Sequence, residues 1–349
     1  MCLSEAKGMD ITMRFEILSP GPLTTVQDMG RRGYGDRGWQ ESGCCDKYSL
    51  RQANRLAGNR ADEAGQERAV LEMTLQGPSI RFLGDGIMAL AGADMSCCLN
   101  GEALPMYRPI PVKEGDVFTS QMAVSGLRGY MAFSGGIDVP VVMGSRSTNI
   151  KCRTGGFQGR ALQAGDLLFT GEGNSQTELF LPGRELPIPD PGLFTSVTAW
   201  RWLGDKKIPL LRTVPGPQED AFTGEALDAF WRNEYRLTAD CDRMACRLEG
   251  EAIAARGAYD ILSDGILEGS VQVTAGGKPV VMLADHQTVG GYAKIGTVIR
   301  PDIAVLAQLK PGEAVGFKPV TPQEGIEIFR REEERLARLE AFCLRRIEK

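Results

Sequence analysis

The sequence predicts a mainly β fold with a few helices, arranged as two related halves. Short apolar runs recur along the chain, and Gly-Asp and Pro-Gly turn signals separate them. Many short strands with frequent turns are typical of β-barrels and β-sandwiches. Several motifs of the first half also recur 192 residues later, and 349 residues are sufficient for two domains.

The clearest strand signals are four short apolar runs. The last of them leads into a cluster of polar residues and is expected to be a buried strand. The runs are Val70–Leu75, Ile87–Leu90, Tyr130–Phe133 and Pro279–Leu283.

Three segments are expected to be helical. Tyr48–Leu56 follows Asp46, whose side chain is suited to capping the first turn, and Ala221–Trp231 is a second candidate. Pro322–Lys349 is charged and amphipathic, which predicts a helix that either docks on the domain or binds a partner. Its apolar face carries Leu336, Leu339, Cys343 and Ile347.

Composition divides the chain into four regions. Met9 and Met13 are alternative starts and no apolar signal core follows Met1, so residues 1–13 are expected to be a flexible extension. A proline-rich stretch, Leu181–Gly192, marks the boundary between the halves. We therefore expect the first half at 14–190, the second half at 191–320 and the terminal helix at 321–349.

An internal repeat supports the two halves. Five positions match at an offset of 192 residues: an Arg, a Leu and a Gly, then a Leu and a Gly. We hypothesise a duplicated domain, and the alternative is chance similarity between glycine-rich turns. The matched segments are Arg55–Gly58 with Arg247–Gly250, and Leu75–Gly77 with Leu267–Gly269; the runs Ile87–Leu90 and Pro279–Met282 obey the same offset.

Charge and composition argue against several classes of function. The net charge of −5 argues against nucleic acid as the main partner. No run of 18 apolar residues is present, so we expect no membrane span, and the lack of targeting signals favours the cytoplasm. Nine cysteines without Cys-x-x-Cys, beside one histidine, argue for free thiols and against a metal site.

The common catalytic signatures are absent. The chain has no P-loop, no Gly-x-Ser-x-Gly elbow and no Met-Lys-Met sequence for attaching biotin. Gly33–Gly38 spells Gly-x-Gly-x-x-Gly, but no apolar strand precedes it, so we expect a loop. Gly144–Thr148 is either a small anion-binding loop or a plain polar turn.

One segment combines several reactive side chains. Leu283–Tyr292 contains the only histidine of the chain, His286, between an acid and an amide, and a Gly-Gly pair follows. Polar groups at the end of a strand and before a glycine turn commonly form a site, because glycine lets the backbone approach a ligand. The alternative is a hairpin turn whose polar side chains are satisfied locally.

Two blocks of sequence resemble the biotin-dependent carboxyltransferase family, also called allophanate hydrolase subunit 2-like. The match extends from about Arg14 to Val320 and implies a cyclophilin-like β-barrel architecture in each half. The first block comprises Pro20–Tyr34, Ser42–Asp46 and Ala53–Asn59, and the second comprises Asp242–Gly250 and Ala284–Tyr292; Gly135–Pro140 and Gly144–Thr148 also match.

The chain departs from the family pattern at a few positions. Cys44-Cys45 stands where relatives usually have Ala-Met, and Ala245 stands where they usually have Gly. The position of His286 is often Arg in relatives, which shifts attention to the residues that follow it.

The resemblance implies an enzyme subunit that is inactive alone. The first expectation is the C component of an ATP-dependent 5-oxoprolinase complex, which opens the lactam of 5-oxoproline to give glutamate. Its partners would be a subunit-1-like protein (the B component) and a lactam-utilisation protein; no cofactor is bound covalently, and the complex uses ATP. The alternatives are the carboxyltransferase component of a urea carboxylase or allophanate system, which uses carboxybiotin carried by another chain, and a non-catalytic regulatory binding protein.

The resemblance and the chemistry of amides together give the candidate site residues. Side-chain amides and carboxylates bind the edges of a planar amide, and backbone N–H groups stabilise an oxyanion. Asp285 or His286 is the expected general base, and Arg243 and Glu249 either pair with each other or bind a substrate carboxylate. Asp46 is either a cleft residue or only a helix cap. The catalytic candidates are Asp285, His286, Gln287 and Thr288, and the substrate-binding candidates are Gln27, Asp28, Ser42, Asp46, Arg243, Glu249, Gln272, Gly290, Gly291 and Tyr292, with Tyr292 as the cap of the pocket.

Overall fold

The computed structural model describes residues 12–173, 199–203 and 206–344. The predicted boundary segment Leu181–Gly192, residues 1–11 of the predicted extension, and Ile347 lie outside the described residues. Met13 was expected in the extension, but it is buried in the core of the first half, and its backbone N–H donates to Thr170 Oγ1 at 2.9 Å.

The first half is a sandwich of two antiparallel sheets with an apolar core between them. Phe15 of one sheet stacks on Phe133 of the other, with 4.5 Å between ring centroids. In strand order, one sheet comprises β11 (Leu167–Phe169), β1 (Arg14–Ser19), β4 (Ser79–Phe82), β9 (Val117–Thr119), β6 (Cys98–Leu99) and β7 (Glu102–Ala103). The other comprises β2 (Leu23–Gln27), β3 (Val70–Thr74), β10 (Ser125–Phe133), β5 (Gly86–Asp94) and β8 (Pro109–Val112).

The second half is a closed barrel, because its last strand returns to pair in parallel with β13. The barrel encloses a separate apolar core that includes Val271, Val281 and Phe317. In order around the ring, the strands are β13 (Lys206–Pro215), β20 (Lys294–Val298), β17 (Ser270–Val273), β18 (Pro279–Met282), β15 (Ala245–Glu249), β14 (Glu234–Leu237) and β21 (Ala314–Pro319). Strand β12 (Ala199–Leu203) extends β13, and β16 (Asp260–Gly265) with β19 (Val289–Tyr292) forms a separate two-stranded ribbon.

The predicted helices are present, with corrected ends. Helix α1 (Lys47–Leu56) begins after Asp46, whose carboxylate accepts the backbone N–H groups of the first turn, as predicted. Helix α2 (Gly224–Arg232) begins three residues later than expected, because Thr223 caps it and a 3-10 turn, η4 (Glu219–Ala221), precedes it. A short helix that was not predicted, α3 (Arg300–Ala307), follows β20.

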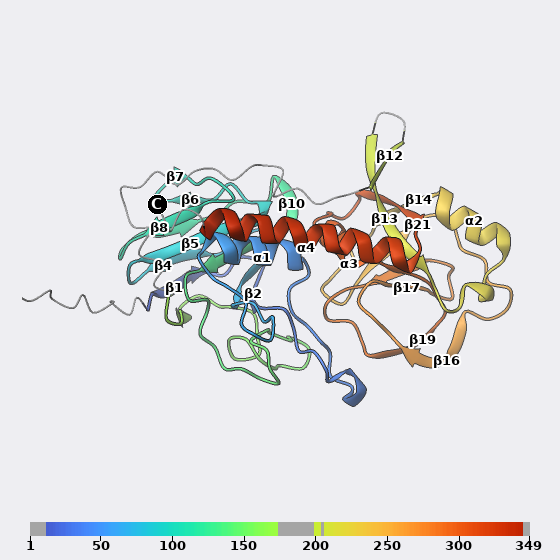
Figure 1. The fold of residues 1–349 in the computed structure, drawn as a ribbon, viewed down its shortest axis with the longest axis horizontal. Coiled ribbons are helices and arrows are strands. Elements are labelled where there is room, and N and C mark those ends of the chain that lie inside the picture. Colours follow the sequence, from blue (N-terminus) through green and yellow to red (C-terminus); the bar gives the residue numbers. More distant parts are fainter. Residues whose placement is uncertain (1–11, 174–198, 204–205, 345–349) are drawn as a thin grey trace, which may run out of the picture.

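Helix α4 (Pro322–Leu344) extends across both halves (Figure 1). Leu339 is fully buried in a cluster with α1, and Leu336 is 3% exposed. Arg51 of α1 donates two hydrogen bonds to Glu333, at 2.5 and 2.9 Å. The predicted apolar face therefore docks on this chain, which confirms the first of the two expectations for this helix.

The four predicted strands are confirmed, and the mainly β fold in two halves is confirmed with them. The offset of 192 residues relates β4 to β17 and β5 to β18. The pairing differs, however, because β17 and β18 are hydrogen-bonded neighbours, whereas β4 and β5 lie in different sheets. The duplication stays a prediction that superposition of the two halves would test.

No helix within the described residues combines the length and the apolarity needed to cross a lipid bilayer.

Candidate functional site

Arg243 joins the two halves of the molecule. It lies just before β15, and its Nε donates to Asp285 Oδ2 at 3.0 Å, within the second half. Its other nitrogens reach the first half, where Nη1 donates to Glu72 and Nη2 donates to the Gly43 carbonyl at 2.5 Å. Burial favours the neutral form, but Asp285 and Glu72 outweigh it and raise the pKa of Arg243 above its ordinary value.

Asp46 belongs to the same junction and is more than a helix cap. Its carboxylate accepts the backbone N–H of Ser49 at 2.9 Å and also Nε2 of Gln308, from the second half, at 2.8 Å. Its own backbone N–H donates to the Tyr130 hydroxyl, which in turn donates to Glu72. Burial raises the pKa of Asp46, and the hydrogen bonds from Gln308 and Ser49 oppose the shift. The helix-cap interpretation of Asp46 is confirmed, and its role as a cleft residue stays a prediction.

A second polar cluster lies entirely in the first half, around Asp28. Asp28 accepts hydrogen bonds from the Gly30 N–H at 2.9 Å, the Ser145 hydroxyl at 2.6 Å and the Arg146 N–H at 2.5 Å. Gln27 Nε2 donates to the Thr148 carbonyl at 3.1 Å, while Gln27 Oε1 is buried without a partner among the described residues.

Four of the backbone N–H groups of the loop Gly144–Thr148 already have acceptors, which favours the polar-turn interpretation over anion binding. The N–H of Ser145 donates to Val142, that of Ser147 to the Ser145 hydroxyl, and that of Thr148 to Val26. The Arg146 N–H is held by Asp28. The loop is a polar turn whose backbone presents no free donor row.

Gln40 and Asn149 connect the first-half cluster with the junction. Gln40 Nε2 donates to the Asp285 carbonyl at 2.6 Å, across the two halves. Asn149 Nδ2 lies 2.7 Å from Gln40 Oε1 and 2.9 Å from Ser42 Oγ. These hydrogen bonds bring the predicted residues Asp285 and Arg243 against first-half residues that lie 245 and 200 positions away in the chain.

His286 and Gln287 follow Asp285 in the same segment. His286 is 6% exposed, and its Nδ1 lies 2.7 Å from the Gln287 carbonyl. A carbonyl can only accept, so Nδ1 is the donor of this contact, and in the neutral imidazole Nε2 carries the lone pair. Gln287 Oε1 is buried and lacks a partner among the described residues. Thr288 is half-buried, and its carbonyl accepts the Ile266 N–H at 2.9 Å.

The remaining second-half candidates gather at the ribbon beside the barrel. Gln272 of β17 donates to the Tyr292 carbonyl at 3.3 Å. A Cβ at Gly290 would lie 2.9 Å from Gln272 Nε2, so the glycine permits this close approach. Gly291 is half-buried on β19, and Tyr292 is 37% exposed; its role as the cap of a pocket stays a prediction.

Sequence reasoning missed Lys294 at this ribbon. Lys294 is 5% exposed, and its Nζ donates to Asp264 at 2.5 Å and to the Gly265 carbonyl at 2.7 Å. The hydrogen bond from Lys294 lowers the pKa of Asp264. Lys294 lies in a strand with no flanking motif, so no local signal marked it.

Glu249 lies apart from these clusters. Its side chain is 65% exposed and faces Lys278 at 3.6 Å. The predicted ion pair between Arg243 and Glu249 is therefore wrong. Side chains alternate between the two faces of a strand, and Glu249 is on the outward face of β15 beside the buried Leu248.

Arg31 is the most unusual residue that sequence reasoning passed over. It is 2% exposed, its Nη2 donates to the Ser147 carbonyl, and its Nε and Nη1 have no partner among the described residues. Burial lowers the pKa of this guanidinium, and Asp28 and Asp285 oppose the shift only in part. Two adjacent arginines in the sequence give no indication of which one is buried.

Two pockets border these clusters. The larger, of about 630 Å³, lies in the first half and is lined by Asp28, Gln66 and Arg146 among others. Its size is within the usual range for sites that bind small molecules. It gives the Asp28 cluster an opening to solvent.

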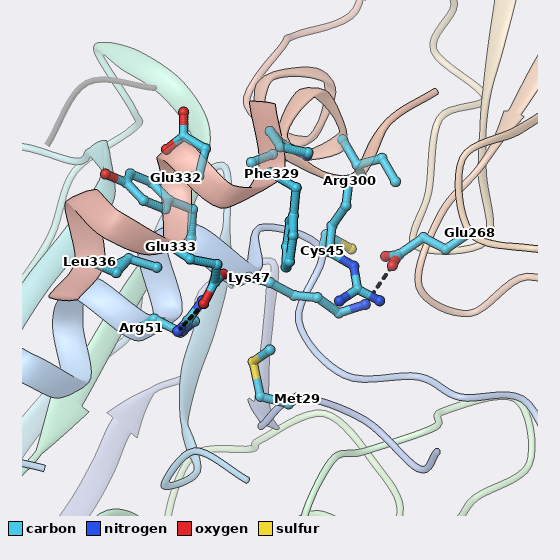
Figure 2. Close-up of a pocket in the computed structure, with 14 residues that line it drawn as sticks. Met29, Cys45, Lys47, Arg51, Glu268, Arg300, Phe329, Glu332, Glu333 and Leu336 are labelled. Carbon is cyan, nitrogen blue, oxygen red and sulfur yellow. Dashed lines mark hydrogen bonds and ion pairs between the residues drawn. The ribbon is translucent and has the colours of Figure 1, made fainter. Parts of the chain in front are cut away.

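The smaller pocket, of about 50 Å³, lies among α1, α3 and α4 at the junction (Figure 2). Lys47 and Glu268 form an ion pair across the two halves at its edge, and Arg51 pairs with Glu333. A volume of this size holds only a few water molecules. The Lys47–Glu268 ion pair joins the two halves here, and the Arg51–Glu333 pair joins α1 to α4.

Comparison with known proteins shows which family the chain is similar to. Residues 37–319 match the family model "Carboxyltransferase domain, subdomain A and B". The chain is 35% identical to the C component of 5-oxoprolinase from Escherichia coli, over 89% of this chain and 93% of that protein. It is 32% identical to the C component of 5-oxoprolinase from Haemophilus influenzae, over 91% and 95%.

Among solved structures, the fold is similar to that of K. lactis urea amidolyase, with a TM-score of 0.81 at 28% identity over 93% of this chain. The chain spans only 20% of the length of that protein. The family match covers most of the chain and agrees with the sequence blocks that resembled it. The chain belongs to the carboxyltransferase-domain family with subdomains A and B.

Proposed function

We propose that this chain is the C component of an ATP-dependent 5-oxoprolinase and that, with its partner subunits, it opens the lactam of 5-oxoproline to give glutamate. The observation that carries the proposal is the similarity to two proteins of that name, which extends over nearly the whole of each. The partners proposed are a subunit-1-like protein and a lactam-utilisation protein, and the chain is inactive without them.

The junction between the halves offers groups that suit a lactam. A lactam presents an N–H donor and a C=O acceptor on adjacent edges. Gln287 Oε1 is a buried acceptor without a partner among the described residues, and it is the group we assign to the lactam N–H. A substrate at this position would satisfy an acceptor whose burial is otherwise unfavourable.

His286 is the general base in this proposal. Its Nδ1 proton is held by the Gln287 carbonyl, so Nε2 is the basic nitrogen. Asp285 accepts two hydrogen bonds from Arg243, at 3.0 and 3.3 Å, and therefore positions the segment. The complex consumes ATP to drive ring opening, and the groups named here hold the lactam and move its protons.

The second candidate function is the carboxyltransferase step of a urea carboxylase, in which carboxybiotin from another chain is a substrate. The fold similarity to K. lactis urea amidolyase favours it. Urea is also a planar amide, so the same side chains suit it. The two functions differ in the substrate that the assembled complex consumes.

Reconstitution with both proposed partners tests the function. The full complex is expected to release glutamate from 5-oxoproline only when ATP is present, and this chain alone is expected to release none. Absence of glutamate from the complete set, together with consumption of carboxybiotin that depends on urea, would favour the second candidate.

The role of His286 is tested in the same complex. His286→Gln is expected to lower kcat by about 100-fold or more, the usual contribution of a general base. Glu249→Gln is the matched control, because its side chain is 65% exposed and lies apart from the junction. A His286→Gln complex with wild-type kcat would remove the histidine from the chemistry.

A further inference from the structure

The Arg31 guanidinium is a buried charge that the protein leaves largely unsatisfied. Of its donors, only Nη2 has a partner among the described residues, the neutral carbonyl of Ser147. No carboxylate of the described residues lies within ion-pair distance of it. An uncompensated buried charge is strongly unfavourable. Proteins retain such a group where a ligand supplies the missing partner.

The two carboxylates whose charges act on Arg31 already accept hydrogen bonds from other donors. Asp28 accepts from Gly30, Ser145 and Arg146, and Asp285 accepts twice from Arg243. Neither carboxylate is free to move to Arg31 without breaking these bonds. The negative partner must therefore come from outside this cluster.

The guanidinium is also held in place. A Cβ at Gly155 would lie 2.0 Å from Arg31 Nη2 and 2.2 Å from the Ser147 carbonyl, so only glycine leaves room for the side chain there. Gly155 has a φ of +67°, which other residues rarely adopt. The position of the charge is thus determined by the backbone, as expected for a preorganised binding group.

An exposed loop follows this position in the chain. Residues 32–39 are exposed apart from Tyr34, and the loop, with its short helix η1 (Gly35–Arg37), projects from the body of the molecule (blue in Figure 1). Its backbone hydrogen bonds join Tyr34 with Arg37 and Trp39, inside the loop itself. A segment with so few contacts to the core opens at low free-energy cost.

We propose that Arg31 is the residue that selects a substrate carrying a carboxylate, and that it binds this carboxylate of the lactam substrate. The proposal rests on the proposed function and adds to it the residue that recognises the carboxylate of the substrate. A carboxylate oxygen would supply the charge-assisted hydrogen bond that the free guanidinium nitrogens lack. Urea and 2-pyrrolidinone are neutral amides, so neither would supply the negative charge that Arg31 lacks.

Inhibition of the reconstituted complex tests this selection. Cyclopentanecarboxylate carries the acid without the lactam, and 2-pyrrolidinone carries the lactam without the acid. In Arg31→Met we expect KM for 5-oxoproline and Ki for cyclopentanecarboxylate to rise about 10- to 100-fold, the usual effect of a hydrogen bond to a charged group. Ki for 2-pyrrolidinone should stay within about threefold, since this ligand has no charge to lose.

Two further variants separate charge from structure. Arg31→Lys retains the charge and should recover part of the affinity for the carboxylate. Arg32→Met removes the neighbouring arginine, whose side chain is 50% exposed, and should leave all three constants unchanged. Equal weakening of both inhibitors in Arg31→Met, or no weakening of either, would overturn the proposal.

The proposed function and this inference are tested by different measurements, so either can be rejected without the other. Wild-type release of glutamate tests the function, whereas the difference between wild type and Arg31→Met tests the inference. If the wild-type complex does not open 5-oxoproline, calorimetric titration of that complex with 5-oxoproline and 2-pyrrolidinone still tests Arg31. Equal affinity of wild type and Arg31→Met for 5-oxoproline would then reject it.

Discussion

Arg243 and Arg31 are both buried, at 5% and 2% exposed, but their surroundings are opposite. Arg243 donates to two carboxylates and a carbonyl, and those contacts join the two halves. Arg31 donates to one carbonyl of its own half and leaves two nitrogens without partners among the described residues. A compensated buried charge is part of the structure, whereas an uncompensated one indicates a ligand.

The largest loss of stability is expected from removing the guanidinium of Arg243, whose charge is compensated by carboxylates. Arg243→Met leaves the buried Glu72 and the half-buried Asp285 without their guanidinium and should lower the free energy of unfolding by about 3–5 kcal/mol. Urea denaturation measures it. Arg247→Met, at an exposed position of β15, is the control and should change stability by less than about 0.5 kcal/mol. A loss below about 1 kcal/mol in Arg243→Met would contradict the structural role assigned to it.

Arg31→Met should have the opposite effect on the free energy of unfolding. Replacing a buried charge by an apolar side chain of similar size is neutral or stabilising, by roughly 1–4 kcal/mol. The free energy of unfolding should therefore be unchanged or higher, while binding of a carboxylate is lost. Such a trade of stability for function is common at binding sites. Destabilisation as large as that of Arg243→Met would show that the two arginines have the same role.

Asp46 offers a comparison that depends on pH. Burial raises its pKa from the ordinary 3.8, so the folded state binds the proton more tightly than the unfolded state. Lowering the pH from the raised pKa towards 3.8 should therefore stabilise the wild type relative to Asp46→Asn. At neutral pH Asp46→Asn should be less stable by about 1 kcal/mol, because Asn is an equally good helix cap but its amide nitrogen cannot accept from Gln308 Nε2. Thermal unfolding at several pH values measures the difference, and relative destabilisation of the wild type in acid would contradict it.

The smallest effect is expected for a paired arginine that water can reach. Arg51 pairs with Glu333 of α4, and their side chains are 21% and 38% exposed. Glu333→Gln should lower the free energy of unfolding by about 1 kcal/mol or less, and added salt should reduce the difference. A loss near that of Arg243→Met would mean that α4 holds the halves together more strongly than the buried junction does.

Much of the fold follows from local patterns. The cap Asp46, the buried run Pro279–Met282 and the apolar face of α4 were all visible as short-range signals, and all are confirmed. The start of α2 was missed because Thr223, which caps it, is preceded by a turn that looks helical in sequence. The family match follows from several motifs in the right order.

The candidate site was less accessible to the same reasoning. Arg243 was identified but given the wrong partner, since Glu249 is on the outward face of β15 and Glu72 is 171 residues away. Arg31 was passed over because burial and the lack of a partner leave no trace in composition. Lys294 was missed for the same reason.

Local patterns were sufficient to predict the mainly β class, four of the strands and three of the helices, because capping, periodicity and turn signals act within a few residues. The pairing of the charges became visible only in the folded chain. Desolvation and ion pairing depend on groups that the fold brings together from distant parts of the chain. Arg243 and Arg31 are both ordinary arginines in the sequence, and only the folded chain makes one a joint between halves and the other a binding group.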